Sequence, residues 1–128
     1  MSDHYLVFRA AGGEWLLAMR HVVEVGLPDA DDTGAHRRWR DRVLPVRDMN
    51  GQLGGTAAAG TALHQIVVQG ADDLEVLAVE EIVGLQTVAA DALVPFAPTD
   101  ARTAACVDRA LPRTDGRCAL RLRWPPAG

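Results

Sequence analysis

Apolar residues stand in short blocks along the chain, and glycine, proline or aspartate separates one block from the next. Pairs of such blocks with a turn signal between them are typical of β-hairpins. The predicted hairpins pair 5–10 with 15–19, 63–69 with 74–81, and 106–112 with 117–124. The chain is therefore predicted to be mostly β-structure.

The stretch after the first hairpin carries two further signals. Met19, Val22 and Val23 recur at helical spacing, which predicts a short helix after the second strand. Pro45 lies inside an apolar stretch, and proline confines a strand to an edge or a bulge. A bent strand is therefore expected there.

The segment 49–71 carries no charged side chain when histidine is neutral, and its length would allow a membrane span. Glutamines and glycines interrupt it, so we interpret 49–62 as a loop that leads into a strand. Residues 82–88 are expected to be extended with a bend at Gly84, and one helical turn is expected at 89–93. Short strands with glycine and proline turns and little helix are typical of an all-β barrel.

Several residue types that enzymes depend on are missing or isolated. The chain has no lysine and its only serine is Ser2, which excludes a Schiff-base lysine, a phosphate-binding loop and a serine hydrolase. Cys106, Cys118 and the four histidines show no metal-ligand spacing, so neither a metal site nor a cofactor is expected. Both cysteines are expected to be small buried residues. The net charge of −4 argues against a dedicated nucleic-acid binder.

The chain has 128 residues, which is the size of a single domain. Its first residues lead directly into the first predicted strand, without the basic and apolar segments of a signal peptide. We therefore expect a cytoplasmic protein that does not insert directly into a membrane.

Four blocks of the sequence follow a pattern known from one family. They read YLVFRAAGGEWLLAMRHVVEVG, WRDRVLPVRDMNGQLG, LEVLAVEEIVGLQTVAADALVPFAP and ACVDRALPRTDGRCALRLR. In this order they resemble the CheW-like domain of bacterial chemotaxis coupling proteins. Residues 21–25 match its K-V-x-E-I segment, and Arg40, Pro45 and Asp48 match positions in its L-R-G-x-x-x-P-V-x-D-L segment. The blocks cover nearly the whole chain.

The resemblance implies an all-β fold with minor helix, made of two intertwined five-stranded SH3-like barrels within one domain, 1–128. We expect the first subdomain to comprise about 1–50 with 104–124, and the second about 62–100. The resemblance also implies a non-enzymatic adaptor. Its expected partners are the regulatory domain of a CheA-type histidine kinase and a methyl-accepting chemoreceptor or analogous input protein, in chemotaxis or another form of motility.

The sequence also departs from the family pattern. Its R-G pair reads Arg40-Asp41 here, the preceding N-L reads Arg38-Trp39, and Glu80-Glu81 replaces an Asp-Gly step. The connection before Arg40 is short, and the usual helix after the last strand is absent. We expect these changes to reduce the binding repertoire while leaving the fold intact.

The matched positions suggest a partner-binding set of Val22, Glu24, Arg40, Ile82 and Leu85. Val22, Glu24 and Arg40 match positions at the family's receptor groove, where a planar guanidinium holds a carboxylate or carbonyl group in two hydrogen bonds. Ile82 and Leu85 are candidates for an apolar groove between the subdomains. The alternative is that Val22, Ile82 and Leu85 are core residues and that Arg40 is simply solvated.

The densest basic segment comprises Arg37, Arg38, Arg40 and Arg42 around Trp39. One interpretation is an electrostatic contact with acidic partner residues. Another is a small-barrel nucleic-acid module, because arginine and an aromatic ring together stack on bases and bind phosphate. A solvated loop, its charge offset by the aspartates before it, is the third interpretation. Nucleic acid is not the expected partner of an acidic protein.

Overall fold

The computed structural model of the chain describes residues 2–27, 36–49, 53, 64–96 and 105–125. Within these ranges the chain forms strands and two single-turn 3₁₀ helices. In chain order they are β1 (Ser2–Ala10), β2 (Gly13–Ala18), η1 (Met19–His21), β3 (Val22–Gly26), β4 (His36–Trp39), β5 (Arg42–Asp48), β6 (His64–Gln69), β7 (Leu74–Val79), β8 (Glu81–Ala89), η2 (Ala90–Ala92), β9 (Val94–Pro95), β10 (Val107–Pro112) and β11 (Cys118–Leu122).

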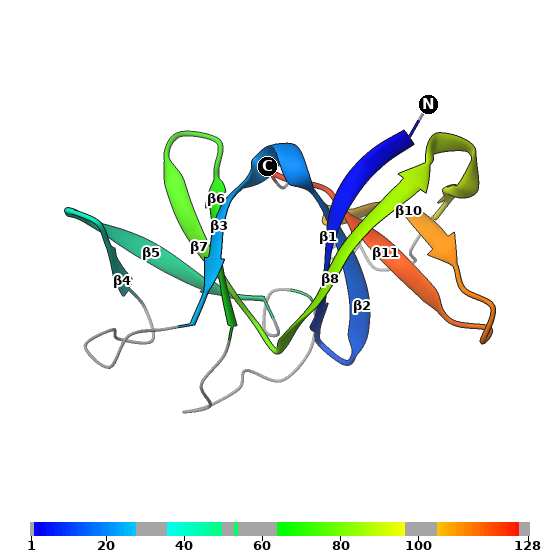
Figure 1. Ribbon diagram of the computed structural model, residues 1–128, viewed down its shortest axis with the longest axis horizontal. Helices are drawn as coiled ribbons and strands as arrows, with labels where there is room; N and C mark the ends of the chain where they lie inside the picture. Colours follow the sequence, from blue (N-terminus) through cyan, green and yellow to red (C-terminus); the bar gives the residue numbers. More distant parts are fainter. Residues whose placement is uncertain (1, 28–35, 50–52, 54–63, 97–104, 126–128) are drawn as a thin grey trace.

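The strands form two sheets, which Figure 1 shows as two groups side by side. One sheet has six strands in the order β8-β1-β2-β11-β10-β9, and the other has five in the order β3-β6-β7-β5-β4. Neighbouring strands are antiparallel except for two parallel pairs, β11 with β2 and β5 with β7. The prediction of an all-β chain is confirmed. The strand counts are six and five rather than five each, because the two-residue β9 adds an edge strand.

The three predicted hairpins are confirmed as β1–β2, β6–β7 and β10–β11. The first turns at Ala11 and Gly12, which both have positive φ (52° and 75°). A two-residue turn of this kind matches the twist of the strands it joins, and it requires positive φ at both positions. The predicted helical turn is η2. The predicted bend at Gly84 lies opposite a register shift between Val7 and Phe8, where Gly84 has a φ of 153°.

One local prediction was wrong in part, and the position of Pro45 is explained by strand pairing. The helix expected after β2 is only the single turn η1, because the β-branched run that starts at Val22 pairs with β6 instead. Pro45 does not lie on an edge strand. It lies where β5 changes partner, since residues up to Pro45 pair with β4 and residues from Val46 onward pair with β7. The loop predicted at 49–62 lies outside the described residues, apart from Met49 and Leu53.

The chain crosses between the sheets at η1 and again at Glu80, the single residue between β7 and β8. Strands β3, β4 and β5 consequently belong to the same sheet as β6 and β7, whereas β8 and β9 belong to the other. This grouping differs from the expected subdomains, which placed 1–50 with 104–124. The reason is that β3 and β5 pair with strands distant in sequence, and local patterns do not identify such partners.

Alternate residues of β1 face different parts of the core. Leu6 and Phe8 pack in the largest cluster of buried residues, together with side chains of β6 and β7 from the other sheet. Tyr5 and Val7 pack in a second cluster, with residues of β2, β8 and β11. Successive side chains of a strand point to opposite faces, so β1 is buried on both faces. The largest cluster therefore joins the two sheets.

A third cluster lies within the five-stranded sheet. It contains Trp39, Leu44, Val67 and Val76. Strand β6 supplies this cluster with Val67, and it supplies the largest cluster with the neighbouring residues on either side. The five-stranded sheet is consequently also packed on both faces.

An ion pair bridges the last hairpin. Arg121 donates from Nε and Nη2 to the two carboxylate oxygens of Asp108, at 2.9 and 2.7 Å. Asp108 lies at a register shift between β10 and β11. The hydrogen bonds from Arg121 hold the pKa of the Asp108 carboxyl below its usual value, and they more than offset the opposing effect of partial burial.

We predict that Asp108→Asn reduces the dependence of stability on pH in acid. Because the folded protein binds this proton at a lower pH than the unfolded chain does, the pair stabilises the fold above about pH 4, and its contribution is lost as pH falls further. We expect a loss of about 1–2 kcal/mol at pH 7 and a smaller loss near pH 2, measured by urea unfolding at several pH values. Asp73→Asn, in an exposed pair, is the control and should change stability little. Equal losses for Asp108→Asn at both pH values would contradict the prediction.

Candidate partner-binding surfaces

Side chains join the two ends of the five-stranded sheet. Strands β3 and β4 stand at opposite ends of its strand order. Trp39 on β4 donates from Nε1 to Oε2 of Glu24 on β3, at 2.6 Å. Arg37 on β4 donates from Nη1 to Oε1 of Gln65 on β6, at 2.9 Å, and both residues are buried. The sheet is therefore curved so far that its first and last strands approach each other.

Arg40 begins the tight turn between β4 and β5. It has a φ of 55°, a left-handed conformation that a residue with a side chain adopts only at a cost. Its guanidinium carbon lies 4.3 Å from the centroid of the Trp39 ring, which is within range for a cation–π contact. The turn thus places the exposed Arg40 side chain over the neighbouring indole.

The structure brings Glu24 and Arg40 together through Trp39, which contacts both. Both residues were predicted at a partner-binding surface, whereas Trp39 was assigned to the basic segment. The indole contacts Glu24 through its N–H and Arg40 through its ring. Glu24 and Arg40 do not themselves form an ion pair among the described side chains. The two charges are therefore held near each other by one ring and are not neutralised directly.

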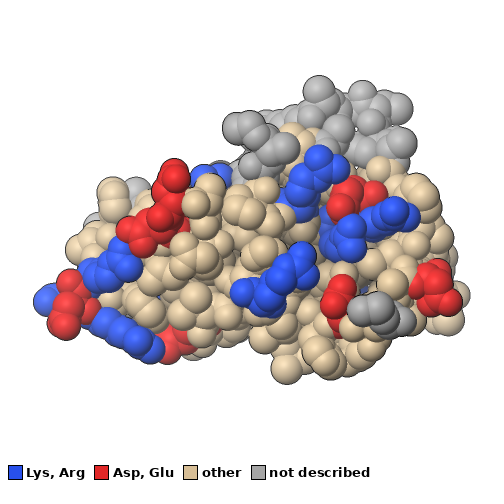
Figure 2. Space-filling model, turned by 90° about the horizontal axis from the view of Figure 1, so that it is seen from above, with Lys and Arg blue, Asp and Glu red and all other residues tan. Residues whose placement is uncertain are grey.

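The basic segment does not form a continuous positive surface. Arg37 and Trp39 are buried, whereas Arg38 is exposed, as expected for alternating residues of a strand. Arg42 donates to Asp73 at 2.5 Å, and this hydrogen bond lowers the pKa of Asp73. On the face seen in Figure 2, basic side chains are interspersed with acidic ones. Trp39 is only 8% exposed, so its ring is not available to stack on a base.

Leu85 lies on β8 in the other sheet, and its side chain is 72% exposed. It lines an open pocket of about 440 Å³ together with His4, Met19, Gln86 and Thr87. His4 Nδ1 lies 2.9 Å from Thr87 Oγ1, which joins β1 to β8 beside the pocket. An exposed leucine beside an open pocket offers a partner an apolar contact.

Val22 and Ile82 have a different environment from the other predicted residues. Both are half-buried and pack against the largest core cluster. Ile82 and Leu85 were expected to line one groove, but Ile82 packs towards the core while Leu85 is exposed. Val22 lies on β3, as Glu24 does, and Ile82 lies on β8, as Leu85 does.

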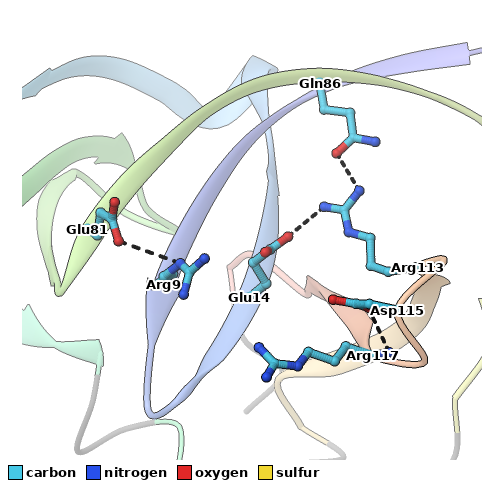
Figure 3. Close-up of polar contacts among 7 residues, drawn as sticks. All are labelled: Arg9, Glu14, Glu81, Gln86, Arg113, Asp115 and Arg117. Atoms are coloured by element: carbon cyan, nitrogen blue, oxygen red, sulfur yellow. Dashed lines mark hydrogen bonds and ion pairs between the residues drawn. The ribbon is translucent and has the colours of Figure 1, made fainter.

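The structure also shows a polar pocket that the sequence did not indicate. It has a volume of about 330 Å³ and lies beside the β1–β2 and β10–β11 turns. Figure 3 shows polar contacts around it: Arg113 donates to the carboxylate of Glu14 and to the amide oxygen of Gln86, at 2.6 and 2.9 Å. Arg9 lies 3.5 Å from Glu81. These residues come from four strands and turns far apart in sequence, so no local motif could have indicated the pocket.

Both cysteines are free, but they differ in exposure. Cys106 is buried, as predicted, whereas Cys118 is exposed and lines the polar pocket, so its predicted burial was wrong. Burial lowers the pKa of His21, and the neighbouring Arg20 adds to this effect. Among the described residues, no three histidine, cysteine or acidic side chains are arranged to hold a metal ion. None of the helices in these ranges is long and apolar enough to span a membrane.

Comparison with protein families shows a CheW-like domain over residues 4–125. The chain belongs to the CheW-like domain family. Its structure is similar to the crystal structure of the scaffolding protein TtCheW from Thermoanaerobacter tengcongensis, with a TM-score of 0.77 and 17% sequence identity. The match covers 96% of this chain and 90% of that one. No curated protein matches the sequence.

The match with TtCheW confirms that this mainly β chain, with its two sheets, has the CheW-like fold. The family also confirms the resemblance from which the site residues were chosen. Sequence reasoning did not identify the role of Trp39 as the link between Glu24 and Arg40. The available signal was the position of an aromatic residue immediately before the matched arginine.

We predict that Gln65→Leu destabilises the CheW-like fold. The substitution removes the acceptor of Arg37 Nη1, one contact of this buried guanidinium, and the loss of a buried hydrogen bond to a charged group costs about 1–3 kcal/mol. Chemical denaturation would measure the loss. Gln69→Leu on the same strand is the matched control, because Gln69 is exposed and should change stability by less than about 0.5 kcal/mol. A similar loss in both variants would contradict the assigned role of Arg37 and Gln65.

Proposed function

We propose that this CheW-like protein is a non-enzymatic adaptor that couples a chemoreceptor-type input protein to the regulatory domain of a CheA-type histidine kinase. The observation that carries the proposal is the family match over residues 4–125, nearly the whole chain. The similar protein TtCheW is itself described as a scaffolding protein. This role would place the protein in the cytoplasm, beside receptor arrays, and it requires neither cofactor nor metal.

An adaptor needs at least two surfaces, and the structure offers two of different chemistry. The first is polar and comprises Glu24 and Arg40 around Trp39, in the five-stranded sheet. The second is the apolar pocket lined by Leu85, in the six-stranded sheet. Val22 and Ile82 lie half-buried on the strands that carry these surfaces, and we assign them a supporting part in binding. Separate surfaces on two sheets would allow simultaneous contact with two proteins.

Nucleic-acid binding is not supported by the structure. A small-barrel nucleic-acid module, the alternative function considered for the basic segment, needs an exposed Trp39 beside unpaired arginines. Trp39 is buried, and Arg42 is paired with Asp73. The net charge of −4 also opposes binding to a polyanion.

The proposal is tested by binding measurements with partners encoded in the same genome. We expect the full chain to form a ternary complex with a receptor cytoplasmic hairpin and a kinase regulatory domain, detected by size-exclusion chromatography with light scattering. Isothermal titration calorimetry would give the affinity for each partner alone. No binding to either partner at about 100 μM would overturn the proposal.

We predict that Leu85→Asp weakens binding of the kinase regulatory domain at least tenfold without unfolding the protein. The leucine is largely exposed, so the stability cost should be under about 0.5 kcal/mol, while a buried carboxylate at the interface is unfavourable. Val43→Asp is the matched control, because Val43 is a 67% exposed apolar residue on the other sheet. Equal binding of the kinase regulatory domain by wild type and Leu85→Asp would exclude the pocket as a surface for that partner.

A further inference from the structure

Nearly every part of the Trp39 indole is in contact with the protein. Its side chain packs with Leu44, Val67 and Val76 in the third core cluster. Its N–H donates to Glu24, and its ring lies beneath the guanidinium of Arg40. An indole held in this way by a packed core has little freedom to move.

The two charged groups meet the ring from different directions. An indole N–H lies in the plane of its ring, so the Glu24 carboxylate is at the ring edge. Arg40 lies over the ring, 4.3 Å from its centroid. A carboxylate can accept several hydrogen bonds, and a guanidinium can donate five. Glu24 and Arg40 therefore keep most of this capacity for another molecule.

Because both charged side chains are already fixed, binding a partner costs less side-chain conformational entropy. A free glutamate or arginine side chain loses rotamer freedom when it is held at an interface, typically at a cost of about 0.5–1.5 kcal/mol. Here the hydrogen bond restricts Glu24, and the ring contact with the tight turn restricts Arg40. The arrangement is therefore already suited to binding before a partner arrives.

We propose that Trp39 is a positioning residue, and that it holds Glu24 and Arg40 as a two-charge recognition site for a protein segment with one basic and one acidic side chain in complementary order. This inference rests on the proposed adaptor function and specifies the chemistry of the receptor segment. The guanidinium of Arg40 receives the partner carboxylate in two hydrogen bonds, and Glu24 accepts from the partner cation. A segment with two like charges would meet one repulsive group and be rejected.

Substitutions at Trp39 separate its two contacts. Trp39→Phe keeps a ring beneath Arg40 but removes the N–H that holds Glu24, whereas Trp39→Leu removes both contacts. We expect affinity for the receptor hairpin to fall about fivefold in Trp39→Phe and at least tenfold in Trp39→Leu. Glu24→Gln and Arg40→Gln should each cost about tenfold, because each removes one charge-assisted contact. After Trp39→Phe, the further effect of Glu24→Gln should be smaller than in the wild type.

Trp124→Phe is the matched control. Trp124 also donates its indole N–H, to the carbonyl oxygen of Gln69 at 2.9 Å, and Arg47 lies 5.6 Å from its ring centroid. This variant loses the same kind of hydrogen bond away from the proposed site. We expect its affinity for the receptor hairpin to equal that of the wild type, even where its stability falls as much as that of Trp39→Phe.

The experiment is calorimetric titration of the full chain with the receptor hairpin at two salt concentrations, supported by NMR of the indole N–H groups. Glu24→Gln should move the Trp39 indole resonance, which reports the hydrogen bond. It should also weaken the salt dependence of binding, which a purely structural role would not do. The inference is overturned, while the adaptor function stands, if the receptor hairpin binds the wild type and binds three variants equally well: Glu24→Gln, Arg40→Gln and Trp39→Phe. If wild type binds neither receptor nor kinase domain, the adaptor function fails and the inference fails with it.

Discussion

The burial of β1 on both faces is the constraint on which the rest of the fold depends. Leu6 and Phe8 pack against strands of the five-stranded sheet, while Tyr5 and Val7 pack within their own sheet. A strand with four consecutive buried residues has to lie between two layers of side chains. Because β6 and β7 supply the opposite side of the same core, neither sheet could keep its apolar face covered without the other.

This shared core leaves the outer strands at the surface, where the proposed partner contacts lie. Strands β3 and β4 end one sheet, and β8 is an edge strand of the other. Glu24, Trp39 and Leu85 lie on these strands, at the margin of the packed interior. Each surface is therefore fixed by a rigid layer beneath it while its charged or apolar groups remain accessible. Such a division between core and margin suits a protein whose proposed work is to hold partners without chemical change.

Much of the local structure followed from the sequence. The three hairpins, the bend at Gly84 and the turn before β9 were predicted from short-range patterns of apolar, glycine and proline residues. The prediction of a helix after Met19 was wrong beyond one turn, because the valines that follow form strand β3 and pair with β6. A short apolar segment is compatible with either structure until its partner is known. The exposure of Cys118 was missed for the same reason, since burial depends on which segments pack around a residue.

By itself, the sequence determined the β-rich class, the turn positions and the family pattern, and it excluded chemistries that need lysine or an internal serine. These properties depend on residue identity and on neighbours a few positions away. Only the tertiary structure decided which strands share a sheet and that Trp39 joins Glu24 to Arg40. That contact spans 15 residues and exists only because the curved sheet brings β3 and β4 together. The physical reason is that strand pairing over long distances minimises the exposed apolar surface of the whole chain. A local segment of the sequence does not contain this information.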